Sequence, residues 1–182
     1  GNYIPKNQVV ELLEWTRNRR IKLVVDESFI DFVDQEDDAS ILTDDILNDY
    51  PNLVVIKSIS KSFGVPGLRL GILASSNHEL INYIKKDITI WNINSFAEFY
   101  LQIFEKYKQE YKTAIEKFIA VRKEFMEQII DIPYLRIIPS QANFIMCEIV
   151  QKLKAKDLTR LLLDKHNILI KDLSSKNGIK GE

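Results

Sequence analysis

Residues 54–71, VVIKSISKSFGVPGLRLG, determine how the rest of this chain is interpreted. The stretch begins as a short apolar strand, passes through a polar turn that holds Lys61, and ends in a glycine-punctuated segment that holds Arg69. Ser58 stands three residues before the lysine, and Arg69 stands eight residues after it. A lysine that follows directly on a buried strand, close to a serine and an arginine, is a candidate reactive amine.

The composition is that of an ordinary soluble globular protein. The chain has 182 residues, of which 46% are hydrophobic and 28% charged, and this length suits one domain or slightly more. The formal net charge of -1 does not favour binding to nucleic acid or to an anionic membrane. No apolar run approaches the ~20 residues of a membrane span. Because Cys147 is the single cysteine and cannot form an internal disulfide, we predict a reducing, cytoplasmic location.

The first part of the chain alternates between helical and strand patterns. Residues 21–25 are mostly apolar and β-branched, which is typical of a strand buried on both faces. The acidic residues 34–38 indicate an exposed loop. In order, the patterns predict a helix over 8–20, a strand over 21–25, a short helix over 41–48, strands over 53–59 and 68–74, and a helix over 79–86.

The second part of the chain is dominated by one long helical pattern. Residues 95–130 are periodically apolar and contain no proline or glycine, which predicts one long helix or two abutting helices. After it come paired strands over 135–138 and 143–149, a helix over 154–166 and a final strand over 168–171. Strands that alternate with helices predict an α/β fold, followed here by a smaller α+β lobe. We therefore predict domains at 1–110 and 111–182.

Asp26 and Lys61 each follow a predicted strand. Ligands of open α/β sheets bind beyond the carboxyl ends of the strands. If the two strands are parallel neighbours, both side chains reach the same site. Taken singly, Lys61 is more simply a solvated lysine and Asp26 a turn or capping residue, so only the combination favours a binding site.

Pyridoxal phosphate is a cofactor whose chemistry needs these residue types. A lysine amine such as Lys61 holds it as a Schiff base and, once displaced by substrate, moves protons. A carboxylate such as Asp26 keeps the ring nitrogen protonated. Arg69 offers a bidentate fork to the phosphate, and Ser58 or Ser60 offers a hydroxyl. The alternatives are a surface ion pair for Arg69 and a strand-lining role for Ser58.

Other residues near these motifs have competing interpretations. Glu27 is structural or solvated, and Phe29 either packs in the core or touches the edge of the cofactor. Trp91 is interpreted as a core residue rather than a substrate contact. His78 and His166 are isolated from each other, and no metal site is predicted.

Residues 58–71 resemble the lysine signature of the class I and II aminotransferases, which are fold-type I pyridoxal phosphate enzymes. DESFIDF at 26–32 resembles their aspartate motif, 35 residues (61 minus 26) before the lysine. Further stretches resemble histidinol-phosphate aminotransferase and threonine-phosphate decarboxylase, namely 50–53, 91–95, 139–144 and 168–172. The resemblance implies the C-terminal part of the large domain of that fold, followed by a small domain. It also implies a catalytic Lys61 and the cofactor-binding residues Asp26, Phe29, Ser58, Ser60, Lys61 and Arg69.

The chain departs from the family pattern in two respects. Aminotransferases of this group place a tyrosine hydroxyl on the ring oxygen of the cofactor where Phe29 stands, whereas their decarboxylase-like relatives carry phenylalanine. The chain also lacks the family's N-terminal half and its C-terminal arginine for the substrate carboxylate, so we expect it to be a fragment of a larger enzyme. By the same resemblance, that enzyme is expected to be a homodimer that acts on amino acid and keto acid substrates.

Three functions remain open at this stage. The first is an aminotransferase that acts on an amino acid or an amino acid phosphate. The second is a decarboxylase of an amino acid phosphate, which Phe29 favours. The third is a folded fragment without catalytic activity that associates through exposed apolar surfaces.

Overall fold

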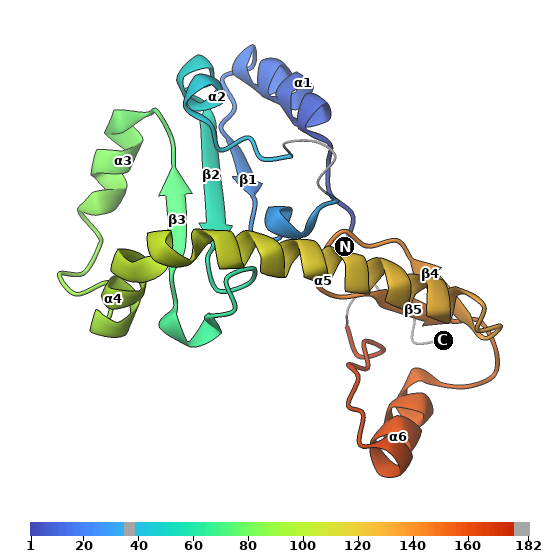
Figure 1. The fold of residues 1–182 in the computed structure, drawn as a ribbon. Helices are drawn as coiled ribbons and strands as arrows, with labels where there is room; N and C mark the ends of the chain where they lie inside the picture. Colours follow the sequence, from blue (N-terminus) through green and yellow to red (C-terminus); the bar gives the residue numbers. More distant parts are fainter. Residues whose placement is uncertain (35–38, 177–182) are drawn as a thin grey trace. The chain divides into compact units, whose positions relative to one another are not determined.

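The computed structural model describes residues 1–34 and 39–176 (Figure 1). The predicted loop over 34–38 therefore lies almost wholly outside the described residues. The chain forms two compact units. The larger unit contains Asn2–Ala120 and Gln141–Asn143, and the smaller contains Val121–Ser140 and the chain from Phe144 onward, together with Gly1. The domain boundary after residue 110 stays a prediction.

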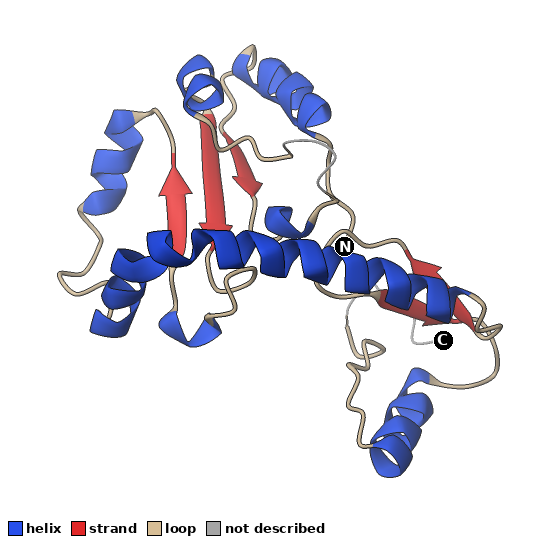
Figure 2. Cartoon of the chain, in the orientation of Figure 1, coloured by secondary structure: helices blue, strands red, loops and turns tan. Residues whose placement is uncertain are grey.

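The larger unit is built on a three-stranded sheet in the order β1-β2-β3 (Figure 2). The strands are β1 (Leu23–Asp26), β2 (Leu53–Ser58) and β3 (Gly71–Ala74). β1 runs parallel to β2, with Asp26 paired to Ile56, whereas β3 is antiparallel to β2, with Gly71 paired to Ser58. The predicted third strand begins later than expected because Pro66–Leu68 form a turn of 3-10 helix, η2. The parallel pairing confirms that the carboxyl ends of β1 and β2 are neighbours.

Two helices cover one face of this sheet. They are α1 (Lys6–Arg17) and α2 (Asp44–Asp49), and Leu13 of α1 and Leu53 of β2 are fully buried. Because successive side chains of a strand point to opposite faces, Val24 lies on the other face, where its side chain is 59% exposed. The prediction that the first strand is buried on both faces is therefore wrong. The core on the covered face consists of Val9, Leu13, Ile41, Tyr50, Leu53 and Val55.

The remaining helices of the larger unit follow the sheet in sequence. They are α3 (His78–Lys85) and α4 (Ser95–Phe104), then the 3-10 turn η3 (Glu105–Tyr107) and α5 (Lys108–Ile130), of which α5 continues into the smaller unit. The prediction of abutting helices over 95–130 is confirmed. Oδ1 of Asn94 caps α4 by accepting the backbone N–H of Ala97 at 2.9 Å. Trp91, in the connector before α4, is 92% exposed, so its interpretation as a core residue is wrong.

The smaller unit contains the antiparallel strands β4 (Leu135–Ile138) and β5 (Met146–Ile149) and the helix α6 (Ala155–His166). The predicted pairing of these two strands is confirmed. The predicted final strand over 168–171 is wrong, because these residues pair with no described strand and Leu169 is 74% exposed. Among the described residues, no helix has the length and apolar character needed to cross a membrane.

Candidate cofactor site at the ends of β1 and β2

The residues predicted to bind the cofactor gather at the carboxyl ends of the two parallel strands. Asp26 is the last residue of β1, and its side chain is exposed. Lys61 lies in the turn that follows β2, three residues after Ser58, and is also exposed. An amine and a carboxylate are therefore both open to solvent at the edge of the sheet where ligands of such folds bind.

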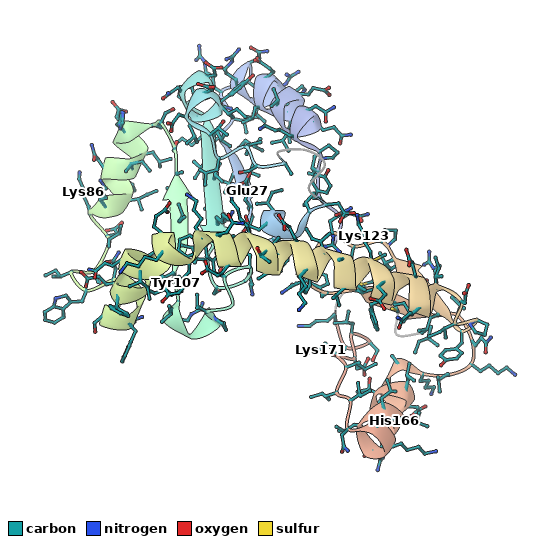
Figure 3. All side chains as sticks on the ribbon, viewed as in Figure 1. Glu27, Lys86, Tyr107, Lys123, His166 and Lys171 are labelled. Atoms are coloured by element: carbon teal, nitrogen blue, oxygen red, sulfur yellow. The ribbon has the colours of Figure 1, made fainter. Side chains whose placement is uncertain are left out.

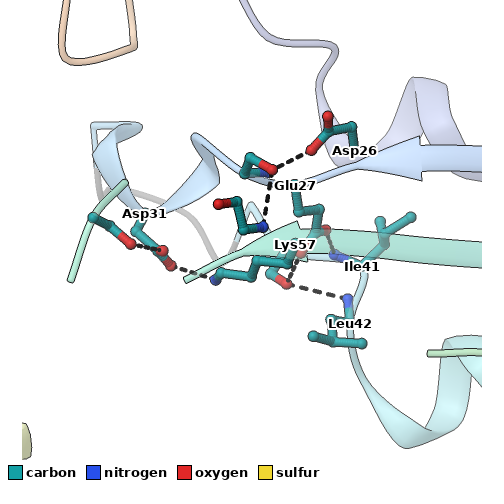
Figure 4. Close-up of polar contacts among 10 residues, drawn as sticks. Asp26, Glu27, Asp31, Ile41, Leu42 and Lys57 are labelled. Carbon is teal, nitrogen blue, oxygen red and sulfur yellow. Dashed lines mark hydrogen bonds and ion pairs between the residues drawn. The ribbon is translucent and has the colours of Figure 1, made fainter. Parts of the chain in front are cut away.

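A chain of hydrogen bonds connects Asp26 with the turn that carries Lys61. Oδ1 of Asp26 accepts the backbone N–H of Ser28 at 2.9 Å, which is the Asp26 end of the network in Figure 4. Oγ of Ser28 accepts the backbone N–H of Ser58 at 2.9 Å, and the hydroxyls of Ser58 and Ser60 lie 2.7 Å apart. The predicted residues Asp26, Ser58 and Ser60 thus share one network. Ser28, which links them, was not predicted, although its place two residues after an aspartate is typical of an Asx-turn.

Phe29 is the aromatic neighbour of Lys61. The Nζ atom of Lys61 lies 5.7 Å from the centroid of the Phe29 ring, within the range of a cation–π contact. The ring is half-buried and lies 6.5 Å from that of Phe32, centroid to centroid. Phe29 therefore packs against a core residue and also faces the Lys61 amine, while its contact with the edge of the cofactor stays a prediction.

Arg69 lies on the far arm of the same hairpin and is exposed. Ser58 pairs with Gly71 and the N–H of Ile59 donates to the carbonyl of Leu70, so continuing this register sets Arg69 opposite Ser60. Arg69 adopts a left-handed backbone conformation with φ 57° and ψ 41°. Nη1 donates to the carbonyl of Pro66 at 3.3 Å, which leaves the other donors of the guanidinium available to a ligand.

Asp31 makes a second set of contacts near the turn that carries Lys61, and these contacts were not predicted. Oδ1 of Asp31 lies 2.6 Å from Nζ of Lys57, and Oδ2 accepts the hydroxyl of Ser62 at 2.6 Å. The Tyr111 hydroxyl from α5 is buried and makes no hydrogen bond of normal geometry among the described residues. Burial strongly raises the pKa of Tyr111, with smaller effects from nearby Ser62 and Asp31. In the sequence, only the positions of Asp31 shortly after the first strand and of Lys61 shortly after the second could have suggested that Asp31 contacts the turn that carries Lys61.

Glu27, which follows Asp26 and is labelled in Figure 3, is a structural residue by its burial and its hydrogen bonds. Its side chain is 3% exposed, so the solvated alternative is wrong. Its carboxylate accepts the backbone N–H of Ile41 at 2.6 Å and the hydroxyl of Ser40 at 2.7 Å. Both hydrogen bonds fix the segment before α2, and they account for the burial of a charged group.

The residues present fit the groups of pyridoxal phosphate. Among residues 1–34 and 39–176, neither Lys61 nor Asp26 forms an ion pair, so each keeps its charge available for a ligand. A dianionic phosphate requires a cation and a hydroxyl donor. Arg69 provides the cation, and the Ser58–Ser60 pair, on the adjacent arm of the hairpin, provides one free hydroxyl proton because the other is used between the two serines. The set holds one amine, one carboxylate and one guanidinium, which matches the aldehyde, the ring nitrogen and the phosphate of the cofactor.

Comparison with known proteins agrees with this chemistry. The family model for aminotransferase class I and II matches residues 1–177. L-serine phosphate decarboxylase of Sulfurospirillum multivorans is 31% identical over 164 residues, which are 88% of this chain and 42% of that protein. Histidinol-phosphate aminotransferase of Flavobacterium johnsoniae is 32% identical over 154 residues, 82% of this chain and 40% of the relative.

Comparison of the fold with solved structures agrees with the sequence comparison. A solved decarboxylase from Sulfurospirillum multivorans superimposes with a TM-score of 0.85 at 30% identity, covering 100% of this chain and 52% of the other. The chain thus spans about half the length of the proteins it matches. The predicted α/β fold of the fold-type I enzymes and the pyridoxal phosphate cofactor are confirmed at the level of the family. The chain belongs to the class I and II aminotransferase family.

Proposed function

We propose that this chain carries the cofactor anchor of a pyridoxal phosphate enzyme that acts on an amino acid, with Lys61 as the residue that binds the cofactor covalently. The observation that supports this most directly is the position of Asp26 and Lys61 after adjacent parallel strands, both exposed. Hydrogen bonds through Ser28 and Ser58 connect Asp26 with Ser60, the residue directly before Lys61.

Each residue has a separate part in the proposed mechanism. Bound pyridoxal phosphate supplies an electron sink for negative charge at the α-carbon of the substrate. Nζ of Lys61 would hold the cofactor at its aldehyde group and would move a proton at the α-carbon of the substrate. The carboxylate of Asp26 accepts a hydrogen bond from the ring nitrogen and keeps it protonated. Arg69, Ser58 and Ser60 bind the phosphate.

The proposal is tested by reductive trapping. Wild-type protein mixed with pyridoxal phosphate and treated with borohydride should carry the cofactor on the peptide that contains Lys61, detected by mass spectrometry. Lys61→Ala should lose both this label and the absorbance of the bound cofactor. Lys86→Ala, which removes another exposed lysine of the same unit, should retain both. An unchanged spectrum in Lys61→Ala would exclude Lys61 as the anchor.

Transamination is the activity we propose first, because the family model and the histidinol-phosphate aminotransferases match this chain. Decarboxylation of an amino acid phosphate is the second candidate. It is favoured by Phe29, which has no hydroxyl to offer the cofactor ring, and by the likeness to L-serine phosphate decarboxylase. Measuring carbon dioxide release and keto acid formation from the same phosphorylated amino acid distinguishes the two.

The third possibility is that the 182-residue chain folds without binding the cofactor. The apolar side chains in and after the connector before α4 favour association, since Ile90 is 94% exposed and Phe96 78% exposed. Titration of the purified chain with pyridoxal phosphate tests this directly. Stoichiometric binding would contradict an inactive fragment, and sedimentation of the same sample gives the oligomeric state, for which a homodimer is the proposal.

A further inference from the structure

We propose that Asp31 is a positioning residue, which braces the turn that carries Lys61 so that the amine is held in one orientation toward the cofactor. The inference rests on the proposed role of Lys61. Asp31 itself is assigned no contact with cofactor or substrate. It acts through Ser62, the residue that directly follows the lysine.

The two oxygens of Asp31 hold two different parts of the hairpin. Asp31 lies in the 3-10 turn η1 (Ile30–Phe32) after β1, Lys57 lies in β2, and Ser62 lies in the turn beyond it. The side chains of Lys57 and Asp31 are only 13% and 19% exposed, so the ion pair is better shielded from water and salt than a surface pair. One carboxylate therefore fixes the start of the turn relative to the strand that supports it (Figure 4).

Aromatic rings also contact the turn that carries Lys61. The ring of Phe63 stacks on that of Tyr111, with centroids 4.4 Å apart and an interplanar angle of 17°. It also lies 4.9 Å from the ring of Phe104. Ser60 is buried, and its hydroxyl lies 2.7 Å from that of Ser58.

Lys61 is consequently an exposed side chain between fixed neighbours. Ser60 before it is held by Ser58, Ser62 after it by Asp31, and Phe63 by Tyr111 and Phe104. Covalent bond formation depends steeply on the position of the attacking atom, and a displacement of about 1 Å costs about a hundredfold in rate. Loss of the hydrogen bond between Ser62 and Asp31 should allow the Lys61 amine to move by such distances, even though the lysine itself is unchanged.

The test uses two variants and a matched control. Asp31→Asn removes the charge opposite Lys57 and leaves Ser62 only a neutral amide oxygen, which is a weaker acceptor than the carboxylate. Ser62→Ala removes only the hydroxyl and is the second variant in case the first folds poorly. Glu14→Gln is the control, because Glu14 is an acid of the same unit whose oxygens accept from Tyr50 and Arg17, both at 2.7 Å and far from the turn in sequence. Two quantities are measured: backbone hydrogen exchange of peptides covering residues 59–65, and the rate at which borohydride traps pyridoxal phosphate on Lys61.

We expect exchange in residues 59–65 to be about tenfold faster in Asp31→Asn, because a charge-assisted contact is lost. Trapping on Lys61 should be about tenfold slower, Asp31→Glu should recover part of the rate, and Glu14→Gln should match the wild type. Unchanged exchange in both variants would overturn the brace. Faster exchange with an unchanged trapping rate would overturn the positioning role. If the wild-type protein itself traps no cofactor on Lys61, the proposed function fails, and the exchange result alone decides whether Asp31 braces the turn.

Discussion

The ammonium nitrogen of Lys61 faces the ring of Phe29, 5.7 Å from its centroid. Under the proposed function, the cofactor binds beside this ring. By the resemblance described in the sequence analysis, aminotransferases of this group are expected to carry a tyrosine hydroxyl at this position. Phe29 is therefore the residue at which the two proposed reactions can be separated experimentally.

Phe29→Tyr adds that hydroxyl without removing the ring. We expect the ratio of keto acid formed to carbon dioxide released to rise by about tenfold, which corresponds to a difference of about 1.4 kcal/mol between the two barriers. Both products are measured from one phosphorylated amino acid. Phe99→Tyr, at a side chain that is 61% exposed, is the control and should leave the ratio unchanged. The same ratio in both variants would show that Phe29 does not select the reaction.

Arg69→Met removes the proposed phosphate clamp and keeps a flexible apolar stem. Charge-assisted hydrogen bonds contribute about 1.5–3 kcal/mol, so pyridoxal phosphate should bind at least about tenfold more weakly. Absorbance titration with the cofactor gives the dissociation constant, and inorganic phosphate should compete with the cofactor in the wild type. Arg136→Met, which breaks the exposed ion pair with Glu148 in the smaller unit, should bind normally. Equal affinity for Arg69→Met and wild type would remove Arg69 from the site.

Leu13→Ala tests the core between α1 and the sheet. Leu13 is 0% exposed, and truncation of such a leucine typically lowers the free energy of unfolding by about 2–5 kcal/mol. Leu12→Ala, one residue earlier at a side chain that is 39% exposed, should cost about 1 kcal/mol or less. Urea unfolding of the two variants measures the difference. Similar losses would mean that the packing of α1 is not as described.

Tyr111→Phe tests the buried phenol at the Lys61 turn. The pKa of Tyr111 is raised in the folded protein, so the folded state favours the neutral phenol more than the unfolded state does. The preference has its full effect on the free energy of unfolding below about pH 10, and this free energy falls as the pH rises beyond that value. The wild type should therefore lose stability above about pH 10 more steeply than Tyr111→Phe. Near neutral pH the variant should be as stable as the wild type or slightly more stable, since the hydroxyl makes no normal hydrogen bond among the described residues.

Urea midpoints measured across this pH range provide the comparison. Tyr107→Phe, at a tyrosine that is 54% exposed, is the matched control and should follow the wild type. Parallel pH curves for wild type and Tyr111→Phe would count against a buried neutral phenol at this position.

The sequence predicted the strands that lead to the candidate site, but it did not predict the side-chain contacts around the turn that carries Lys61. The strands before Asp26 and Lys61 were predicted because apolar runs that end in polar residues are local signals, and the parallel pairing of β1 and β2 confirmed that the carboxyl ends of these strands are neighbours. The roles of Asp26 and Lys61 stay predictions. The contact of Asp31 with Lys57 and Ser62 was missed, because it joins residues that lie 26 and 31 positions apart along the chain. No periodicity in a single sequence encodes which distant polar groups meet.

Two of the wrong predictions concern burial, and a third concerns element type. Val24 and Trp91 are apolar and were expected inside, yet both are largely exposed among the described residues. Apolar character indicates that a side chain gains from being covered, but it does not say which segment covers it. The predicted strand over 168–171 is wrong for a related reason. A segment rich in β-branched and apolar residues forms a strand only where a partner strand is available.

The left-handed conformation of Arg69 has a consequence for how this chain could be stabilised. An L-residue with a side chain pays about 1–2 kcal/mol to occupy that region, and glycine does not. Arg69→Gly should therefore raise the unfolding midpoint while it weakens cofactor binding. With the phosphate role proposed for Arg69, the residue that favours stability and the residue that favours cofactor binding differ at this position, so selection for thermal robustness alone would eliminate the arginine.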